Sequence, residues 1–139
     1  MNISEIISAI TKTIKNNYPE ITIYKDKIQQ GFETPCFFIT CLNVEQKKVG
    51  RNKYARDYLF SIRFHMESPE MIELLQKGEE LQELLQELNK DGQLLIGKEL
   101  NYEVVDDVLQ FYVSYKQRLI KVGNKGPSME SLDLNEGVN

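Results

Sequence analysis

The sequence is poor in the residues that most enzymes and metal proteins use for chemistry. Its 139 residues contain one histidine, two cysteines and no tryptophan, and its eight glycines are scattered rather than gathered in a phosphate-binding loop. The single histidine, His65, has no serine, cysteine or aspartate near it at the spacing of a catalytic triad. We therefore predict no catalytic residue, no metal site and no cofactor.

Long hydrophobic runs and a strong charge of either sign are also absent. No apolar stretch approaches the roughly 18 residues of a membrane helix, and the first residues lack the positive charge of a signal peptide. The net charge of -4 argues against a surface that binds nucleic acid as a whole, although it allows a local basic patch. We expect a protein with no membrane contact that stays in the cytosol, or leaves it only within a larger particle.

The two cysteines lie five residues apart in an apolar run, residues 35–41. If this run is a strand, the odd separation places the thiols of Cys36 and Cys41 on opposite faces of the sheet. They could then neither form a disulfide nor bind one metal ion. We expect two buried free thiols in a reducing compartment.

The apolar pattern predicts one domain over residues 1–122, followed by a flexible, polar C-terminal tail over residues 123–139. Isoleucines at helical spacing follow Asn2, and Glu5 stands where a capping box needs it. Pro19 disfavours helical geometry in the residue before it, so the first helix should end shortly before Pro19.

Six further segments have the composition of strands. They are residues 21–24, 36–46, 54–66, 94–96, 100–105 and 108–118. A second helix is predicted to begin at Ser68-Pro69 and to end near residues 89–92, and Gly78 in its apolar stripe indicates close packing on a sheet. Asp106-Asp107 suggests a turn or bulge. The predicted fold is α+β, a mostly antiparallel sheet of four to five strands with two helices packed on one face.

One cluster of charge reverses the sign of the chain. It surrounds the expected tip between the two long strands and consists of Lys47, Lys48, Arg51, Lys53 and Arg56. One interpretation is protective, because charged tips and edges discourage aggregation between sheets. The other is a projecting basic arm that docks on an acidic surface or tolerates DNA nearby.

The outward face of the sheet is a second candidate surface. Strand alternation places tyrosine and arginine there, two residue types that are common in protein interfaces. The candidate interface residues are Arg63, His65, Tyr112, Lys116 and Arg118. An ordinary solvated sheet face has a similar composition, so both interpretations stay open.

Three pieces of the chain keep a particular order and spacing. They are Gln30-Gly31-Phe32, Pro35-Cys36-Phe37 and the strand from Tyr54 to Phe64 with its arginines, tyrosines and phenylalanines. Together with the isoleucine-rich helix before them and the acidic leucine helix after them, this arrangement resembles the tail terminator family of long-tailed phages and prophages of Gram-positive bacteria. The resemblance covers about residues 1–120.

The resemblance implies a structural function without catalysis. Members of that family form hexameric rings that cap the tail tube, stop its polymerisation and offer a surface to head-completion proteins. DNA passes through the lumen without sequence-specific binding. For this chain the resemblance implies a virion tail protein that assembles in the host bacterial cytoplasm, with copies of itself, the tail tube protein and a head-completion protein as partners. The basic arm would then face the tube or the lumen.

Other functions remain possible from the sequence. The nearest alternative is a tail-completion or head-to-tail joining protein of the same small fold. A small nucleic-acid-binding module could use the basic arm, although the arm lacks the interleaved aromatic residues of a single-strand binder. A small nuclease or hydrolase would need clustered acids or a histidine-centred site, which the sequence does not show.

Overall fold

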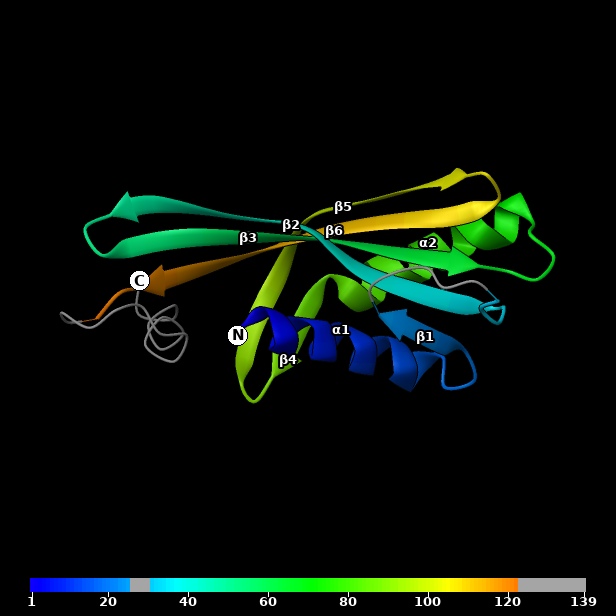
Figure 1. Ribbon diagram of the computed structural model, residues 1–139, viewed down its shortest axis with the longest axis horizontal. Helices are drawn as coiled ribbons and strands as arrows, with labels where there is room; N and C mark the ends of the chain where they lie inside the picture. Colours follow the sequence, from blue (N-terminus) through cyan, green and yellow to red (C-terminus); the bar gives the residue numbers. More distant parts are fainter. Residues whose placement is uncertain (26–30, 123–139) are drawn as a thin grey trace.

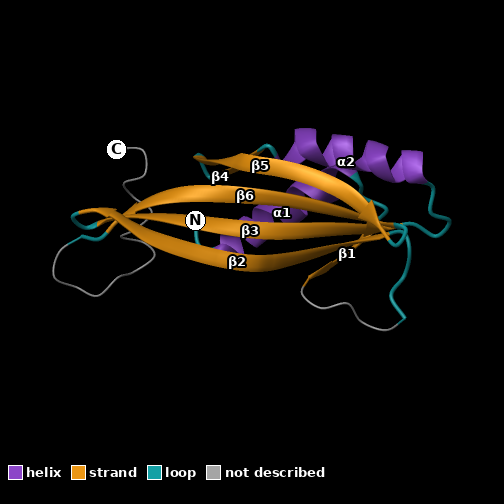
Figure 2. Cartoon of the chain, turned by 90° about the horizontal axis from the view of Figure 1, so that it is seen from above, coloured by secondary structure: helices purple, strands orange, loops and turns teal. Residues whose placement is uncertain are grey.

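The structure is a six-stranded sheet with two helices against one of its faces (Figures 1 and 2). The computed structural model describes residues 1–25 and 31–122, so the tail predicted for residues 123–139 lies outside the described residues. The elements in chain order are α1 (Ile3–Asn17), β1 (Thr22–Lys25), β2 (Cys36–Gly50), β3 (Lys53–His65), α2 (Met71–Leu85), β4 (Glu87–Lys90), β5 (Gln93–Val105) and β6 (Val108–Ile120). Across the sheet the strand order is β1-β2-β3-β6-β5-β4.

The α+β prediction is confirmed, but the predicted strand number and the largely antiparallel pairing are wrong in detail. The sheet has six strands and is mixed, because β1 pairs parallel with β2 while the other neighbours are antiparallel. Residues 26–35 connect these two parallel strands in the sequence. The additional strand, β4, comes from residues that the helical pattern had assigned to the second helix.

The core lies between the helices and one face of the sheet. Alternation along β3 and β6 puts the large apolar side chains on this face, as the sequence predicted. The fully or almost fully buried ones are Tyr58, Phe60, Ile62, Phe64, Leu109, Phe111, Val113 and Tyr115. They pack against three isoleucines of α1 (Ile6, Ile10, Ile14) and three leucines of α2 (Leu74, Leu81, Leu85). We call the opposite side of the sheet the open face.

The first helix follows its sequence signals. The Asn2 side chain accepts a hydrogen bond of 2.9 Å from the Glu5 amide, and the Glu5 carboxylate accepts one of 2.9 Å from the Asn2 amide. This capping box is the predicted one, and the helix ends at Asn17, just before Pro19.

The second helix is shorter than predicted at both ends. It begins at Met71 after an extended Glu70 that makes no side-chain cap, so the proposed Ser68 cap is wrong. At the other end, the Tyr115 hydroxyl donates to the Leu85 carbonyl at 2.5 Å and the Gly97 amide donates to the Gln86 carbonyl at 2.7 Å. These donors from distant strands satisfy carbonyls that a longer helix would have paired internally, so the chain leaves the helix and forms β4.

Gly78 confirms the predicted close approach of helix and sheet. A Cβ atom built on Gly78 would lie 2.4 Å from Cδ2 of the Tyr102 ring. The ring is held by stacking on Phe111 of the neighbouring strand, with centroids 6.3 Å apart. Glycine therefore lets α2 settle directly onto β5.

The cysteines lie on opposite faces, as predicted. Cys36 is opposite His65 on the open face, and Cys41 is opposite Phe60 on the helix face. Cys36 is buried and Cys41 is half-buried, and neither forms a disulfide.

The sheet bends at β5, and two of its strands extend beyond the helices. At a bulge between Gly97 and Glu99 strand β5 bends, and its first part descends with β4 beside α1 (Figure 1). This places Nζ of Lys90 in β4 3.8 Å from Oε2 of Glu5 in α1. On the other side, β2 and β3 continue past the helices as a long hairpin, whose residues 43–58 we call the arm.

Candidate functional site

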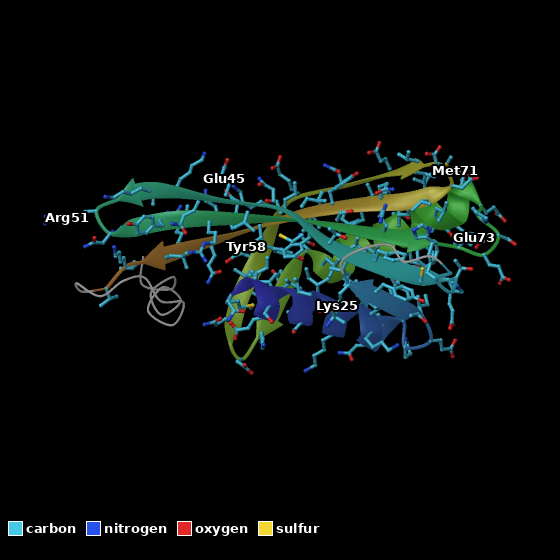
Figure 3. All side chains as sticks on the ribbon, in the orientation of Figure 1. Lys25, Glu45, Arg51, Tyr58, Met71 and Glu73 are labelled. Carbon is cyan, nitrogen blue, oxygen red and sulfur yellow. The ribbon has the colours of Figure 1, made fainter. Side chains whose placement is uncertain are left out.

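The arm places charged residues far from the helices. In Figure 3, Arg51 lies at one extreme of the molecule and Met71 of α2 lies near the other. The tip is a tight turn in which Asn52 has a positive φ of 59°. The end of β6 supports this turn, because the Lys121 amide donates to the Asn52 carbonyl at 2.8 Å. The arm is thus a defined part of the sheet rather than a loose loop.

The structure brings the five predicted basic residues to this arm, but not to one face of it. Lys47 shares the open face, since it is opposite Ala55, whereas Lys48 and Arg56 point to the other side. Lys47, Lys48, Arg51 and Lys53 are exposed. Lys47 lies 4.0 Å from Glu45 in a solvent-exposed pair, which contributes little stability. These four cations are therefore accessible to a partner.

Arg56 has a structural role within the arm. Its Nε and Nη2 atoms donate to Oε1 of Gln46 at 2.9 and 2.7 Å, and its Nη1 atom donates to the Tyr58 hydroxyl at 3.2 Å. The guanidinium group thus joins β2 to β3, and it is less available to a partner than its lysine neighbours are.

The second half of β2, from Leu42 into the arm, is exposed on both faces. Every residue from 42 to 49 is exposed, including Leu42 at 50%, Val44 at 45% and Val49 at 50%. These three side chains add apolar surface to a strand that is otherwise polar and charged. This part of β2 is therefore a candidate contact surface.

The five predicted interface residues all lie on the open face. Arg63 is opposite Gln110, and Tyr112, Lys116 and Arg118 follow on the same face of β6. Lys116 is opposite Asp57, which gives that part of the face one charge of each sign. The shared face follows from strand alternation, whereas a role in subunit contact remains a prediction.

His65, one of the predicted interface residues, is half-buried rather than fully solvated. Its ring packs edge-on against Phe32 and Phe38, with centroid distances of 4.9 and 5.3 Å, and those two rings lie 5.2 Å apart, so the three form one cluster. Burial lowers the pKa of His65, and the positive charge of Arg63 lowers it further. Its buried Nε2 atom has no hydrogen-bond partner within residues 1–25 and 31–122. The neutral His65 ring, together with Phe32 and Phe38, forms an aromatic cluster beside the first residues of β2.

The centre of the open face is hollowed, and sequence reasoning missed part of its lining. The hollow has a volume of about 290 Å³ and is lined by Asn43, Glu45, Asp57, Leu59, Lys98, Glu99, Asn101, Tyr112 and Ser114. Lys98 and Glu99 arrive there because of the β5 bulge, which no local sequence signal marks apart from Gly97. The mixed charges suit contact with a polar surface.

Another set of titratable groups ties α1 to α2. The Tyr18 hydroxyl donates to the Glu80 carboxylate, and Lys77 Nζ lies 3.4 Å from that carboxylate and 4.1 Å from the centre of the Tyr18 ring. Burial and the Glu80 hydrogen bond raise the pKa of Tyr18, while the same hydrogen bond lowers the pKa of Glu80. Both effects hold the tyrosine protonated and the carboxylate ionised, which suits a structural link between helices.

Within residues 1–25 and 31–122, no three His, Cys, Asp or Glu side chains come together in a group that could bind a metal ion. Neither helix has the length and apolar composition to cross a bilayer.

Comparison with known proteins gives one informative match. A family model described as phage tail terminator protein matches residues 5–127. No curated protein sequence matches. One solved structure covers 90% of this chain and 99% of its own, at 10% sequence identity and a TM-score of 0.45, and at that score it carries no argument.

The family match covers α2, all six strands and all but the first two residues of α1, and so includes the arm and the open face. It agrees with the resemblance carried by the three spaced segments, and it supports a structural component of a phage tail. The chain belongs to the phage tail terminator protein family.

Proposed function

We propose that this protein caps the end of the tail tube as a ring of identical subunits, ends tube polymerisation and prepares the tail for head joining. The observation that carries the proposal is the arm, a basic hairpin that leaves the helix-covered body and exposes both faces of β2. The family membership supplies the setting of a phage tail. The function is binding, with no catalytic step.

Ring closure needs two different surfaces on each subunit. A head-to-tail interface that closes by rotation lets every copy offer one surface forward and another backward. A hexamer follows from the family resemblance. In this arrangement DNA passes through the lumen without base-specific contacts, and the two rims of the ring meet the tail tube protein and a head-completion protein.

The arm tip is the proposed tube- or lumen-facing element. Arg51 and Lys53 are exposed at the end of the hairpin, and Figure 3 shows Arg51 far from the helices. Cations at this position attract either an acidic tube end or the phosphates of passing DNA. Such exposed contacts weaken as the salt concentration rises.

Deletion of the coding sequence in a phage that makes this protein tests the function. Electron micrographs should show tube structures longer than normal, because nothing stops polymerisation in the host cytoplasm. Tails of normal length that fail to join heads would instead support the tail-completion alternative. Normal tails that do join heads would refute both functions.

Charge reversal at the tip tests the role of the arm. Complementation with Arg51→Glu/Lys53→Glu should leave tails overlong, while the purified variant keeps the circular dichroism spectrum and melting temperature of the wild type. The matched control is Lys12→Glu/Lys25→Glu, which reverses two exposed cations away from the arm. Tails of normal length with the tip variant would show that the tip does not contact the tube.

A further inference from the structure

Besides the outer edges of the short terminal strands β1 and β4, parts of two long strands have one edge without a partner strand within the described residues. β1 pairs with β2 only over Cys36–Ile39, so residues 42–50 of β2 form an outer edge. β4 pairs with β5 only over Gln93–Ile96, so residues 98–105 of β5 form another. Unpaired edges offer rows of amide and carbonyl groups that another strand can bind.

The two edges carry opposite charge. On the β2 edge and its turn stand Lys47, Lys48 and Arg51, opposed only by Glu45. The β5 edge and its turn carry Lys98 and the acids Glu99, Glu103, Asp106 and Asp107. Two more acids, Glu79 and Glu83 of α2, border a hollow with Tyr102 beside the same edge. A lysine-rich edge by itself would protect against pairing, but it attracts an acidic edge.

Both edges also expose aliphatic side chains. Val44 and Val49 on β2 are 45% and 50% exposed, and Val105 on β5 is 43% exposed. These valines give each edge some apolar surface that a paired strand would remove from water. Charge alone would account for solubility, whereas apolar and charged complementarity together fit a specific contact.

Strand directions allow the edges of two copies to pair. In the order β2-β3-β6-β5, each strand is antiparallel to the next. The direction therefore reverses three times, and β2 and β5 of one copy run in opposite directions. A head-to-tail neighbour therefore brings its β5 antiparallel to β2. The faces also match, because Lys47 and Glu45 share the open face with Glu99 and Glu103.

The two edges are offset along the strand direction. Val44, Tyr58, Tyr115 and Gly97 form one row across the sheet. The β2 edge extends to the arm side of this row, and the β5 edge extends to the other side (Figure 1). Copies that pair must therefore be staggered. Stagger of this kind tilts the strands of closed β-barrels, so repeated pairing is compatible with a ring.

We propose that residues 42–50 of β2 in one copy pair antiparallel with residues 98–105 of β5 in the next, which joins the subunits into one continuous sheet. The inference deepens the proposed ring function by naming its subunit contact. The open face then lines the inside of the ring, and the helices lie outside.

Paired charge reversals in purified full-length protein test this contact. Lys47→Glu/Lys48→Glu gives the β2 edge the sign of its partner, and Glu99→Lys/Glu103→Lys does the same to the β5 edge. Sedimentation over a range of protein concentrations should show wild-type self-association, weakened about tenfold or more in each variant because like charges now face each other. The control Lys12→Glu/Lys25→Glu should associate like wild type.

A mixture of the two edge variants gives the sharpest result. The altered β2 edge of one attracts the altered β5 edge of the other, and their unaltered edges still match. Mixing should therefore restore association, and so should all four changes in one chain. Wild-type protein that stays monomeric at high concentration, variants that associate normally, or a mixture that is not restored would each overturn the proposal. Tail length in the deletion phage is independent of these outcomes, so failure of the edge contact and failure of the terminator function are distinguishable.

Discussion

Replacement of Gly78 by alanine separates helix propensity from packing. Alanine favours a helix by about 1 kcal/mol over glycine. At Gly78, however, the new Cβ atom would lie 2.4 Å from Cδ2, 2.7 Å from Cε2 and 2.8 Å from Cγ of Tyr102. Because three atoms of the ring would be too close to the new Cβ atom, a small shift of the ring cannot relieve the clash. Overpacking of this kind costs about 1–3 kcal/mol. We expect Gly78→Ala to destabilise the protein by about 1 kcal/mol net, or roughly 4 °C in melting temperature for a domain of this size.

A double-mutant cycle measured by urea unfolding tests this reasoning. In a Tyr102→Ala background the obstacle is gone, so Gly78→Ala should now stabilise the protein by up to about 1 kcal/mol. The effect of one substitution thus changes sign with the presence of one ring. If Gly78→Ala stabilises the protein while Tyr102 is intact, the close approach of α2 and β5 does not explain this glycine.

Other features give three shorter predictions. Tyr115→Phe removes the 2.5 Å hydrogen bond to the buried Leu85 carbonyl, and urea unfolding should show a loss of about 1–2 kcal/mol. The lowered pKa of Glu80 stabilises the fold above its ordinary value of 4.5, and this stability is lost as pH falls through the folded pKa; Tyr18→Phe should flatten that acid dependence in urea titrations across a pH series. The lowered pKa of His65 means that the unfolded chain takes up a proton first as pH falls below 6.5, so His65→Gln should lose less stability there than wild type, and an equal loss would contradict the burial argument.

Local signals predicted the elements that local physics controls. The Asn2–Glu5 capping box and the alternation of β3 and β6 were read correctly because each depends on residues close in sequence. The turn at Asp106-Asp107 was also predicted, and both residues have a positive φ, 52° and 63°. At this turn the residue type agrees with the backbone geometry, because aspartate accepts a positive φ more readily than most residues.

Predictions failed where distant residues decide. The second helix stops at Leu85 because Tyr115, thirty positions later, supplies a hydrogen-bond donor there. Leu88 fits the helical apolar stripe equally well as a buried residue of β4, so periodicity could not separate the two. The parallel pairing of β1 with β2 is likewise a contact between separate segments, and the four residues of β1 carry no local signal for its direction.

The candidate surfaces show the same division. The sequence located the basic arm and the open-face residues, because charge clusters and alternation are local patterns. It missed Lys98 and Glu99, which reach the hollow through the β5 bulge, and the acidic character of the β5 edge emerges only once strand order is known. Arg56 was grouped with the arm lysines, but its bonds to Gln46 set it apart.

The cysteine at the start of β2 gives the protein an internal reporter. Burial raises the pKa of Cys36 to about 11, and alkylating reagents react with the thiolate rather than the thiol. At neutral pH the reaction therefore depends on how often this end of the sheet opens to solvent. The alkylation rate of Cys36 therefore measures the local opening of the β1–β2 pair, at the end of the molecule opposite the arm, without an engineered cysteine.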